Sequence, residues 1–181
     1  MIQGYEFREE RRQMLGSDNP HLEKLFKHFK DPSFGEGTEI VGIPEDETSV
    51  NKLLSRGDFF PDTTSVRSEY GTVSGCHYNS ASLFDEDQEN TRIATGYALS
   101  KDGLWRCHSW AIESENGSFD ENSTIIETTE PRERYFGYIL TYKECGQFAK
   151  NEIGSFTPHF PIESTLENNT HPIEPSLNIT I

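Results

Sequence analysis

The apolar positions in the first third of the chain follow a helical period. One face of the first predicted helix carries large apolar residues at the i, i+3, i+4 and i+7 spacing: Leu22, Leu25, Phe26 and Phe29. The Asn-Pro pair at 19–20 is a helix start, and the Asp-Pro pair at 31–32 ends it. Three further segments are expected: a strand at 39–43, a helix at 48–54 and an irregular connection from 58 onward.

From residue 92 the pattern changes to runs rich in aromatic and β-branched residues. Four such runs follow one another: RIATGYAL, LWRCHSWAI, TIIETT and RYFGYILTY. The first two are separated by four residues that include Asp-Gly, a pattern typical of a hairpin. We therefore expect N-terminal helices followed by an antiparallel sheet, an α+β fold.

Length and composition indicate one domain with a C-terminal extension. The chain has 181 residues, enough for one sizeable core, which we expect over 1–150. Residues 151–181 are rich in Pro, Asn, Ser and Thr. This segment is expected either to have little structure of its own or to wrap the core.

The charge of the chain excludes some classes of partner. There are 31 acidic residues against 16 basic ones, a formal net charge of −15, which disfavours binding to nucleic acids and to anionic lipids. A basic protein is the macromolecular partner that this charge favours. No run of 18 apolar residues could span a membrane, the N-terminus lacks the apolar core of a signal peptide, and three cysteines do not make a disulfide framework. We expect a cytoplasmic protein.

A possible nucleophile lies in the stretch GTVSGCHYNSASLF. The residues after Cys76 can form a helix, with Gly75 as its entry, so a central helix is expected to begin at the cysteine. The unpaired amides and the dipole of a helix N-terminus favour the thiolate. Cys76 is therefore the candidate nucleophile, although a free cysteine is more often a small buried apolar residue, and that alternative stays open.

A base and an acid for this nucleophile lie on the predicted strands. His108 shares a strand face with Arg106 and Trp110, while Cys107 points to the opposite face. Glu127 is a carboxylate in an otherwise uncharged strand. If the two strands pair, Glu127 can lie opposite His108 and hold its ring through Nδ1–H, as in a catalytic triad. Two alternatives remain: His108 as a satisfied core residue, and Glu127 paired with an arginine.

These residues resemble a known layout. A cysteine at a helix start, a histidine on the next sheet strand and an acid on the strand after it are similar to transglutaminase-like and papain-like thiol enzymes. The chain also resembles small uncharacterised bacterial proteins that carry four short motifs, here Cys76-His77-Tyr78-Asn79, His108-Ser109-Trp110, Glu127-Thr128 and Tyr135-Phe136-Gly137.

The resemblance implies a papain/transglutaminase-like fold and a hydrolase or acyltransferase. The substrate would be a peptide or a small amide or ester, the intermediate a thioester, and no cofactor would be needed. Two departures matter: the acid is Glu where these enzymes usually carry Asp or Asn, and no glutamine stands a few residues ahead of the cysteine, where papain-like enzymes place an oxyanion donor. The backbone N–H of Cys76, helped by His77 or Asn79, would have to bind the oxyanion.

The side chains of Arg106 and Trp110 could each have a structural or a substrate-binding role. Arg106 is a candidate for binding a substrate carboxylate or phosphate, or for neutralising Glu127. Trp110 belongs to the sheet core or to the wall of a substrate cleft. A zinc site built from the two adjacent Cys-His pairs is disfavoured, because neighbouring side chains diverge, and no metal is expected. The rival function is a non-catalytic acidic binding module on the same scaffold.

Overall fold

The computed structural model describes residues 20–35, 39–42, 47–115 and 119–154. The elements follow one another as α2 (Pro20–His28), the 3-10 helix η1 (Pro32–Phe34), β1 (Glu39–Val41), α3 (Glu47–Arg56), β2 (Asp58–Phe59), β3 (Ser65–Ser68), α4 (Cys76–Glu86), β4 (Thr91–Leu99), β5 (Leu104–Glu113), β6 (Thr124–Glu127), β7 (Arg134–Ile139) and α5 (Tyr142–Ile153). The fold is α+β, with the mainly helical first part and the later strands that the sequence predicts.

The strands form one mixed sheet in the order β2-β7-β4-β5-β6-β3, with β1 also paired to β5. The central pairs β4–β5, β4–β7 and β5–β6 are antiparallel, whereas β1–β5 and β3–β6 are parallel. The expected hairpin joins β4 to β5 through a tight turn in which Gly103 has φ 78°, a conformation that favours glycine. The sheet is therefore mainly antiparallel, since β2–β7 is antiparallel as well, and its parallel pairs are β1–β5 and β3–β6.

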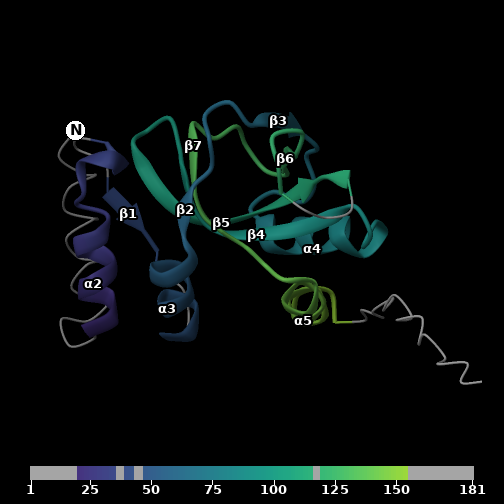
Figure 1. The fold of residues 1–181 in the computed structure, drawn as a ribbon, viewed down its shortest axis with the longest axis horizontal. Helices are drawn as coiled ribbons and strands as arrows, with labels where there is room; N and C mark the ends of the chain where they lie inside the picture. The colour runs from purple at the N-terminus through teal and green to yellow at the C-terminus, as the bar shows by residue number, and fades with distance from the viewer. Residues whose placement is uncertain (1–19, 36–38, 43–46, 116–118, 155–181) are drawn as a thin grey trace, which may run out of the picture.

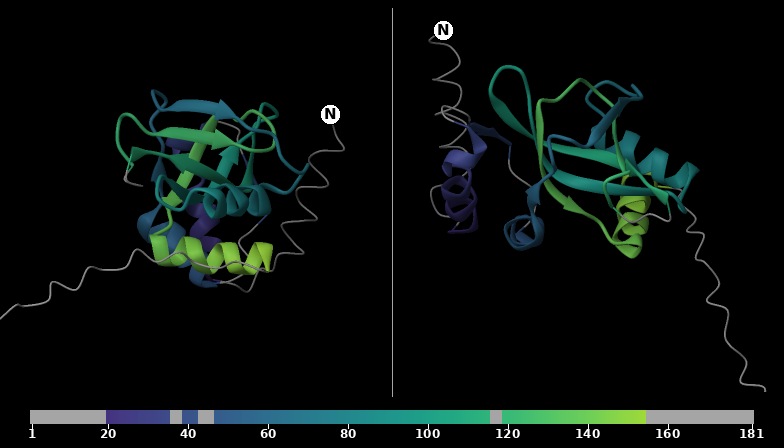
Figure 2. Two further views of the ribbon diagram at one scale, coloured as in Figure 1. Left: turned by 90° about the vertical axis from the view of Figure 1, so that its right-hand side faces the viewer. Right: turned by 45° about the horizontal axis from the view of Figure 1, so that its top comes forward.

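The two faces of the sheet bury different sets of side chains. One face packs against the helices and includes Trp105 of β5 and Phe136 of β7, together with Leu25 of α2 and Phe84 of α4. The other face carries a smaller cluster centred on Trp110, with Tyr135, Ile112 and Ile125. Figures 1 and 2 show α3 and α5 on the same side of the sheet, whereas β3 is its last strand, beside β6. The two tryptophans of β5 thus point to opposite faces, as strand alternation predicts.

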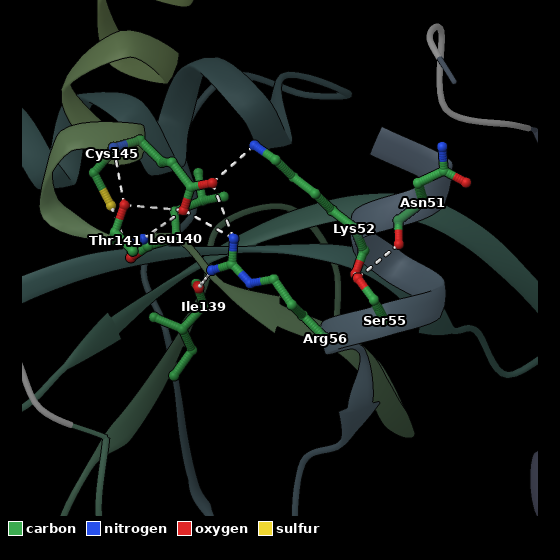
Figure 3. A network of polar contacts seen from close by, with 9 residues as sticks. Asn51, Lys52, Ser55, Arg56, Ile139, Leu140, Thr141 and Cys145 are labelled. Carbon is green, nitrogen blue, oxygen red and sulfur yellow. Dashed lines mark hydrogen bonds and ion pairs between the residues drawn. The ribbon is translucent and has the colours of Figure 1, made fainter. Parts of the chain in front are cut away.

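A polar cluster joins α3 to α5 beneath the sheet (Figure 3). Glu144 caps α5 by accepting from the backbone N–H and hydroxyl of Thr141, in a capping box. The same carboxylate binds Lys52 at 2.7 Å and Arg56 at 2.9 Å, both on α3. Arg56 also donates to the carbonyl of Ile139 at the end of β7. Glu144 therefore caps α5 and also holds α3 against it. Partial burial would raise the pKa of the Glu144 carboxyl, but its hydrogen bonds to Arg56, Lys52 and Thr141 lower it to about 2.

Several sequence-based expectations differ from the structure. The segment from residue 58, expected to be irregular, contains β2 and β3, and the last expected strand, RYFGYILTY, ends at Ile139 and gives way to α5. Because α5 continues to Ile153, the expected domain boundary at residue 150 falls inside a helix. The expected extension from 155 onward lies outside the described residues. None of the helices in the described ranges is long and apolar enough to cross a membrane.

Candidate active site

The candidate nucleophile is the first residue of a helix, as expected. α4 begins at Cys76, and its N-cap, Gly75, has no side chain to cap the helix amides. The first N–H groups of an α-helix have no partner within the helix. No side chain therefore occupies the amides of the first turn, and the N–H of His77 helps to lower the pKa of the Cys76 thiol.

The loop before Cys76 is held by the side chain of Asn79. Its Oδ1 accepts from the N–H of Thr72 (3.0 Å), and its Nδ2 donates to the carbonyls of Thr72 (2.9 Å) and Thr128 (3.3 Å). Gly71 passes so close to this amide that a Cβ there would meet it at 2.6 Å. Ser74 has φ 59°, in the left-handed region that costs a non-glycine residue about 1–2 kcal/mol. The backbone of residues 71–75, which leads to Cys76, is therefore held in one conformation by Asn79.

The same loop is tied to the strand that carries the acid. Beyond the end of β3, the N–H of Glu69 donates to the carbonyl of Glu127 at 2.9 Å. The N–H of Gly71 donates to the carbonyl of Thr128 at 3.0 Å. These bonds continue the parallel β3–β6 pairing toward Cys76. The position of the nucleophile loop is therefore set by the backbone of the acid strand.

A gap in the sheet lets α4 approach β5. The edge of β5 that faces away from β4 pairs with β1 at Leu104–Arg106 and with β6 at Ala111–Glu113. Within the described part of the chain, residues 107–110 have no strand partner on that edge. The N–H of Ser109 lies in this gap, and it helps to lower the pKa of the Cys76 thiol. A helix N-terminus thus takes the place of a strand.

His108 lies at the centre of the site. Its side chain is 1% exposed, and its Nε2–H donates to both oxygens of Glu127, at 2.9 and 3.1 Å. Its imidazole also interacts with the Cys76 thiol, which helps to raise the pKa of His108. Since Nε2 is taken by Glu127, Nδ1 is the nitrogen left for the sulfur. The expectation that Glu127 would hold Nδ1–H is therefore wrong as to the nitrogen.

The acid reaches His108 diagonally, not directly across the strands. The β5–β6 register pairs Ala111 with Ile126, so Glu127 continues to the level of Trp110, two residues along from His108. Trp110 stacks beside the imidazole, with ring centres 6.1 Å apart and planes 22° apart. A Cβ on Gly137 would meet the Trp110 ring at 2.8 Å, so the glycine makes room for this indole.

Glu127 is a completely buried carboxylate with several donors. Besides His108, it accepts from the Tyr135 hydroxyl (2.9 Å) and from the N–H and hydroxyl of Thr129 (both 3.0 Å). An unpaired buried carboxylate would become neutral, whereas these donors favour its charged form. Burial alone would raise the pKa of Glu127, but the hydrogen bond and charge of His108, helped by Thr129 and Tyr135, lower it below the ordinary value.

The electrostatics of the other two residues favour an ion pair. Burial opposes ionisation of Cys76, but His108 and the N–H groups of Ser109 and His77 lower the pKa of the thiol below its ordinary value. Burial would likewise lower the pKa of His108, but Cys76 and Glu127 together raise it. A lowered thiol pKa beside a raised imidazole pKa favours a thiolate next to an imidazolium.

A second hydrogen-bonded chain joins α4 to β5 on the helix side of the sheet. His77 Nδ1 lies 2.7 Å from the hydroxyl of Ser109, which donates to the hydroxyl of Thr95 at 3.0 Å. Since the Ser109 hydroxyl donates to Thr95, it accepts from His77 Nδ1–H. Ser109 thus holds α4 twice, through its N–H to Cys76 and through its side chain to His77.

The four expected oxyanion or substrate residues lie in other environments. His77 donates to Ser109, and Asn79 uses both its amide hydrogens on backbone carbonyls. Arg106 makes a two-pronged ion pair with Asp102 at 2.7 and 2.8 Å, not with Glu127. Trp110 is completely buried in the core of the sheet. His77, Asn79 and Trp110 therefore support the surroundings of Cys76 and His108, whereas Arg106 belongs to the β4–β5 turn.

The remaining cysteines lie apart from this cluster. Cys145 is buried in the helix-side core, and burial raises the pKa of its thiol to about 11. Cys107 points to the helix side, as expected, and packs near Gly42. It lines a cavity of about 520 Å³ between α3, α5 and the sheet, which His77 and His108 also line and Cys76 does not. In the described residues, no three His, Cys, Asp or Glu side chains gather to hold a metal ion.

Sequence reasoning missed three contributors to the site. Tyr135 and Thr129 bind the Glu127 carboxylate, and Ser109 binds both the Cys76 sulfur and His77. Tyr135 and Ser109 lie within the short motifs quoted above, but only the pairing of the strands gives them partners. The chain matches no protein-family model, no curated protein and no solved structure. The case for function therefore rests on the geometry.

Proposed function

We propose that the protein is a thiol-dependent acyl-transfer enzyme with the triad Cys76, His108 and Glu127. The observation that carries the proposal is that both ends of one buried imidazole are occupied. The thiol at the start of α4 acts on one end and raises the pKa of His108, and the Glu127 carboxylate binds Nε2 at the other end. This is the arrangement of an activated cysteine, its base and the group that orients the base.

In the proposed reaction, the Cys76 thiolate attacks the carbonyl carbon of an amide or ester. The tetrahedral oxyanion collapses to a thioester and expels the amine or alcohol, which takes a proton from the His108 imidazolium. Water or a second nucleophile, deprotonated by His108, then breaks the thioester and restores the thiolate. Glu127 stays ionised and keeps the imidazole oriented and charged.

The oxyanion would bind to backbone amides at the start of α4. The glycine N-cap supplies no side chain to occupy them, and the N–H of Cys76 is closest to the bond that forms. Asn79 is committed to the loop, so we assign it a positioning role. In papain-like enzymes a glutamine side chain helps to bind the oxyanion, whereas here the helix amides alone would bind it.

The order of the elements supports a papain/transglutaminase-like scaffold. A helix begins at the cysteine, the second following strand carries the histidine, and the next strand carries the acid. We propose a cytoplasmic hydrolase or acyltransferase acting on peptides or on small amides or esters. Glu in place of the usual Asp or Asn fits the diagonal approach of the acid, since the longer side chain bridges the two-residue offset.

The proposal is tested by alkylation of the folded protein with iodoacetamide at a series of pH values, with each cysteine located by mass spectrometry. Cys76 should react fastest below pH 7, and His108→Ala should remove this advantage. Cys145, whose thiol has a pKa of about 11, is the buried internal control. If Cys76 reacts no faster than the other cysteines, the proposal fails, and the acidic binding module becomes the better description.

A further inference from the structure

Exposed apolar side chains gather along the segment that contains Cys76. Five large apolar residues in the described ranges are well exposed, and four of them fall within residues 66–78: Val66, Tyr70, Val73 and Tyr78. Val73 is 89% exposed and Tyr70 is 62% exposed. Scattered apolar residues need no explanation, but a concentration of them marks a contact surface. This one borders the candidate nucleophile.

A free strand edge runs into the same segment. β3 lies at the end of the sheet and pairs with β6 alone among the described strands. The N–H of Glu69 donates to β6, and alternate residues of a strand direct their backbone groups to opposite edges. The N–H and C=O groups of Val66, Ser68 and Tyr70 therefore point away from β6. An open edge of this kind is a template for an added strand.

The surroundings of this edge are acidic. Segments 63–76 and 113–127, which carry β3 and its neighbours, contain Arg67 as their only base. Leaving aside Glu127, which is bound to His108, their acids are Glu69, Glu113, Glu115, Asp120 and Glu121. Arg67 is already paired with Glu69 and Glu113, at 2.6 and 2.9 Å. The edge therefore has an excess of negative charge that a basic chain would complement.

We propose that the substrate is a basic polypeptide that pairs in an extended conformation with the free edge of β3. Its backbone binds the outward groups of residues 66, 68 and 70. Its apolar side chains pack on Tyr70 and Val73, and its basic side chains face the acids around β3. The path continues along the loop to Cys76. This inference rests on the proposed function, since it names the substrate class of the same site.

The experiment measures acylation of Cys76 by synthetic octapeptide thioesters of alternating sequence: Val-Lys, Val-Ser and Val-Glu repeats. The Cys76 thiolate attacks the thioester carbonyl, the acyl group moves to Cys76, and the probe's thiol leaves as a thiolate. Two further Val-Lys probes carry N-methyl groups on alternate amides. One probe is methylated at the odd-numbered amides and the other at the even-numbered amides. Only one of the two therefore loses the N–H groups that face β3. Each rate is divided by the iodoacetamide rate of Cys76 in the same protein.

We expect the Val-Lys probe to react at least about tenfold faster than the Val-Glu probe at low salt, with the ratio falling as salt rises. One N-methyl phase should slow the reaction by about threefold to tenfold and the other should not, since one hydrogen-bonded edge is lost. Ser68→Pro removes an outward N–H at an edge position that tolerates proline and should slow the Val-Lys probe similarly. Ser68→Ala is its matched control.

Equal rates for the three repeats, with no dependence on the N-methyl phase, would overturn the inference. The N-methyl probes act on the unmodified protein, so this result does not depend on the folding of any variant. Failure of the proposed function itself looks different. In that case Cys76 would show no advantage over Cys107 and Cys145 toward iodoacetamide, the small neutral reagent that does not use the strand edge.

Discussion

Glu127→Gln is the substitution that most directly separates the charge of the acid from its shape. A glutamine has nearly the same volume, and its amide oxygen can still accept from His108 Nε2–H. The variant therefore keeps the orientation of the imidazole and removes the negative charge that stabilises its protonated form. Because His108 in turn stabilises the Cys76 thiolate, the effect should appear at the sulfur, on the opposite side of the ring.

The size of the effect follows from the short contact between the two groups. Opposite unit charges about 4 Å apart attract by about 4 kcal/mol at an effective dielectric constant of about 20. The 2.9 Å contact between His108 Nε2 and the Glu127 carboxylate is consistent with a separation of about 4 Å between the centres of the two charged groups. Since the glutamine retains a hydrogen bond, we expect about half of this value, about 2 kcal/mol, to be lost. That corresponds to an about 30-fold smaller equilibrium constant for formation of the thiolate–imidazolium pair from the neutral pair.

The sign of the pH dependence can be worked out from the shifts. Loss of the carboxylate lowers the pKa of His108, which is raised in the unmodified protein, and so raises the pKa of Cys76, which is lowered. Alkylation of Cys76 by iodoacetamide near pH 6 should therefore fall, by up to about 30-fold. The difference should shrink above about pH 9, where an ordinary thiol ionises without help.

The control for this measurement is Glu133→Gln, which removes one exposed carboxylate and should leave the labelling curve unchanged. Circular dichroism and thermal unfolding should establish that the Glu127→Gln variant keeps the fold. If that folded variant were alkylated near pH 6 as fast as the unmodified protein, the carboxylate would not be coupled to the sulfur through His108. Cys76, His108 and Glu127 would then not act together as a triad.

Three further substitutions test the supports of the site and the fold. Glu144→Gln removes two ion pairs and should lower the free energy of unfolding at pH 7. The loss is limited to about 1–2 kcal/mol because the Lys52 and Arg56 side chains are about a third exposed, so that water weakens both pairs. That difference should vanish as the pH falls from about 4.5 to about 2 in urea titrations, because a lowered carboxyl pKa stabilises only above it. Asn79→Ala removes three hydrogen bonds and should cost about 2–3 kcal/mol and slow Cys76 alkylation; full stability would contradict its anchoring role. Ser109→Ala should slow alkylation at pH 6 several-fold, whereas Ser80→Ala, which removes a buried hydroxyl without a partner, should not.

Much of the local structure is readable from the sequence because it depends on nearby residues. The start of α4 at Cys76 and the β4–β5 hairpin follow from a glycine entry and an Asp-Gly turn. The start of α5 was also readable in principle. Thr141 and Glu144 have the spacing of a capping box, but the strand-like run before them conceals it.

The pairing of distant segments is what the sequence does not reveal. The four residues of β3, SVRS, are all exposed and show no alternation of apolar and polar positions. Nothing local distinguishes them from a loop, and their partner β6 lies about sixty residues away. The nitrogen of His108 that binds Glu127 also depends on a register that only the folded sheet defines.

The short strands β1 and β6 are a physical condition for the site. Both pair with the same edge of β5, and if they met, a strand would take up the N–H of Ser109 and exclude the Cys76 sulfur. Because β1 stops at the level of Arg106, the N-terminus of α4 can fill the gap. Because β6 pairs no further than Ala111, the side chain of Glu127 is free to turn diagonally toward His108. The same interruption of the sheet thus admits the nucleophile and aims the acid, so lengthening either strand into the gap should disperse the site without unfolding the sheet.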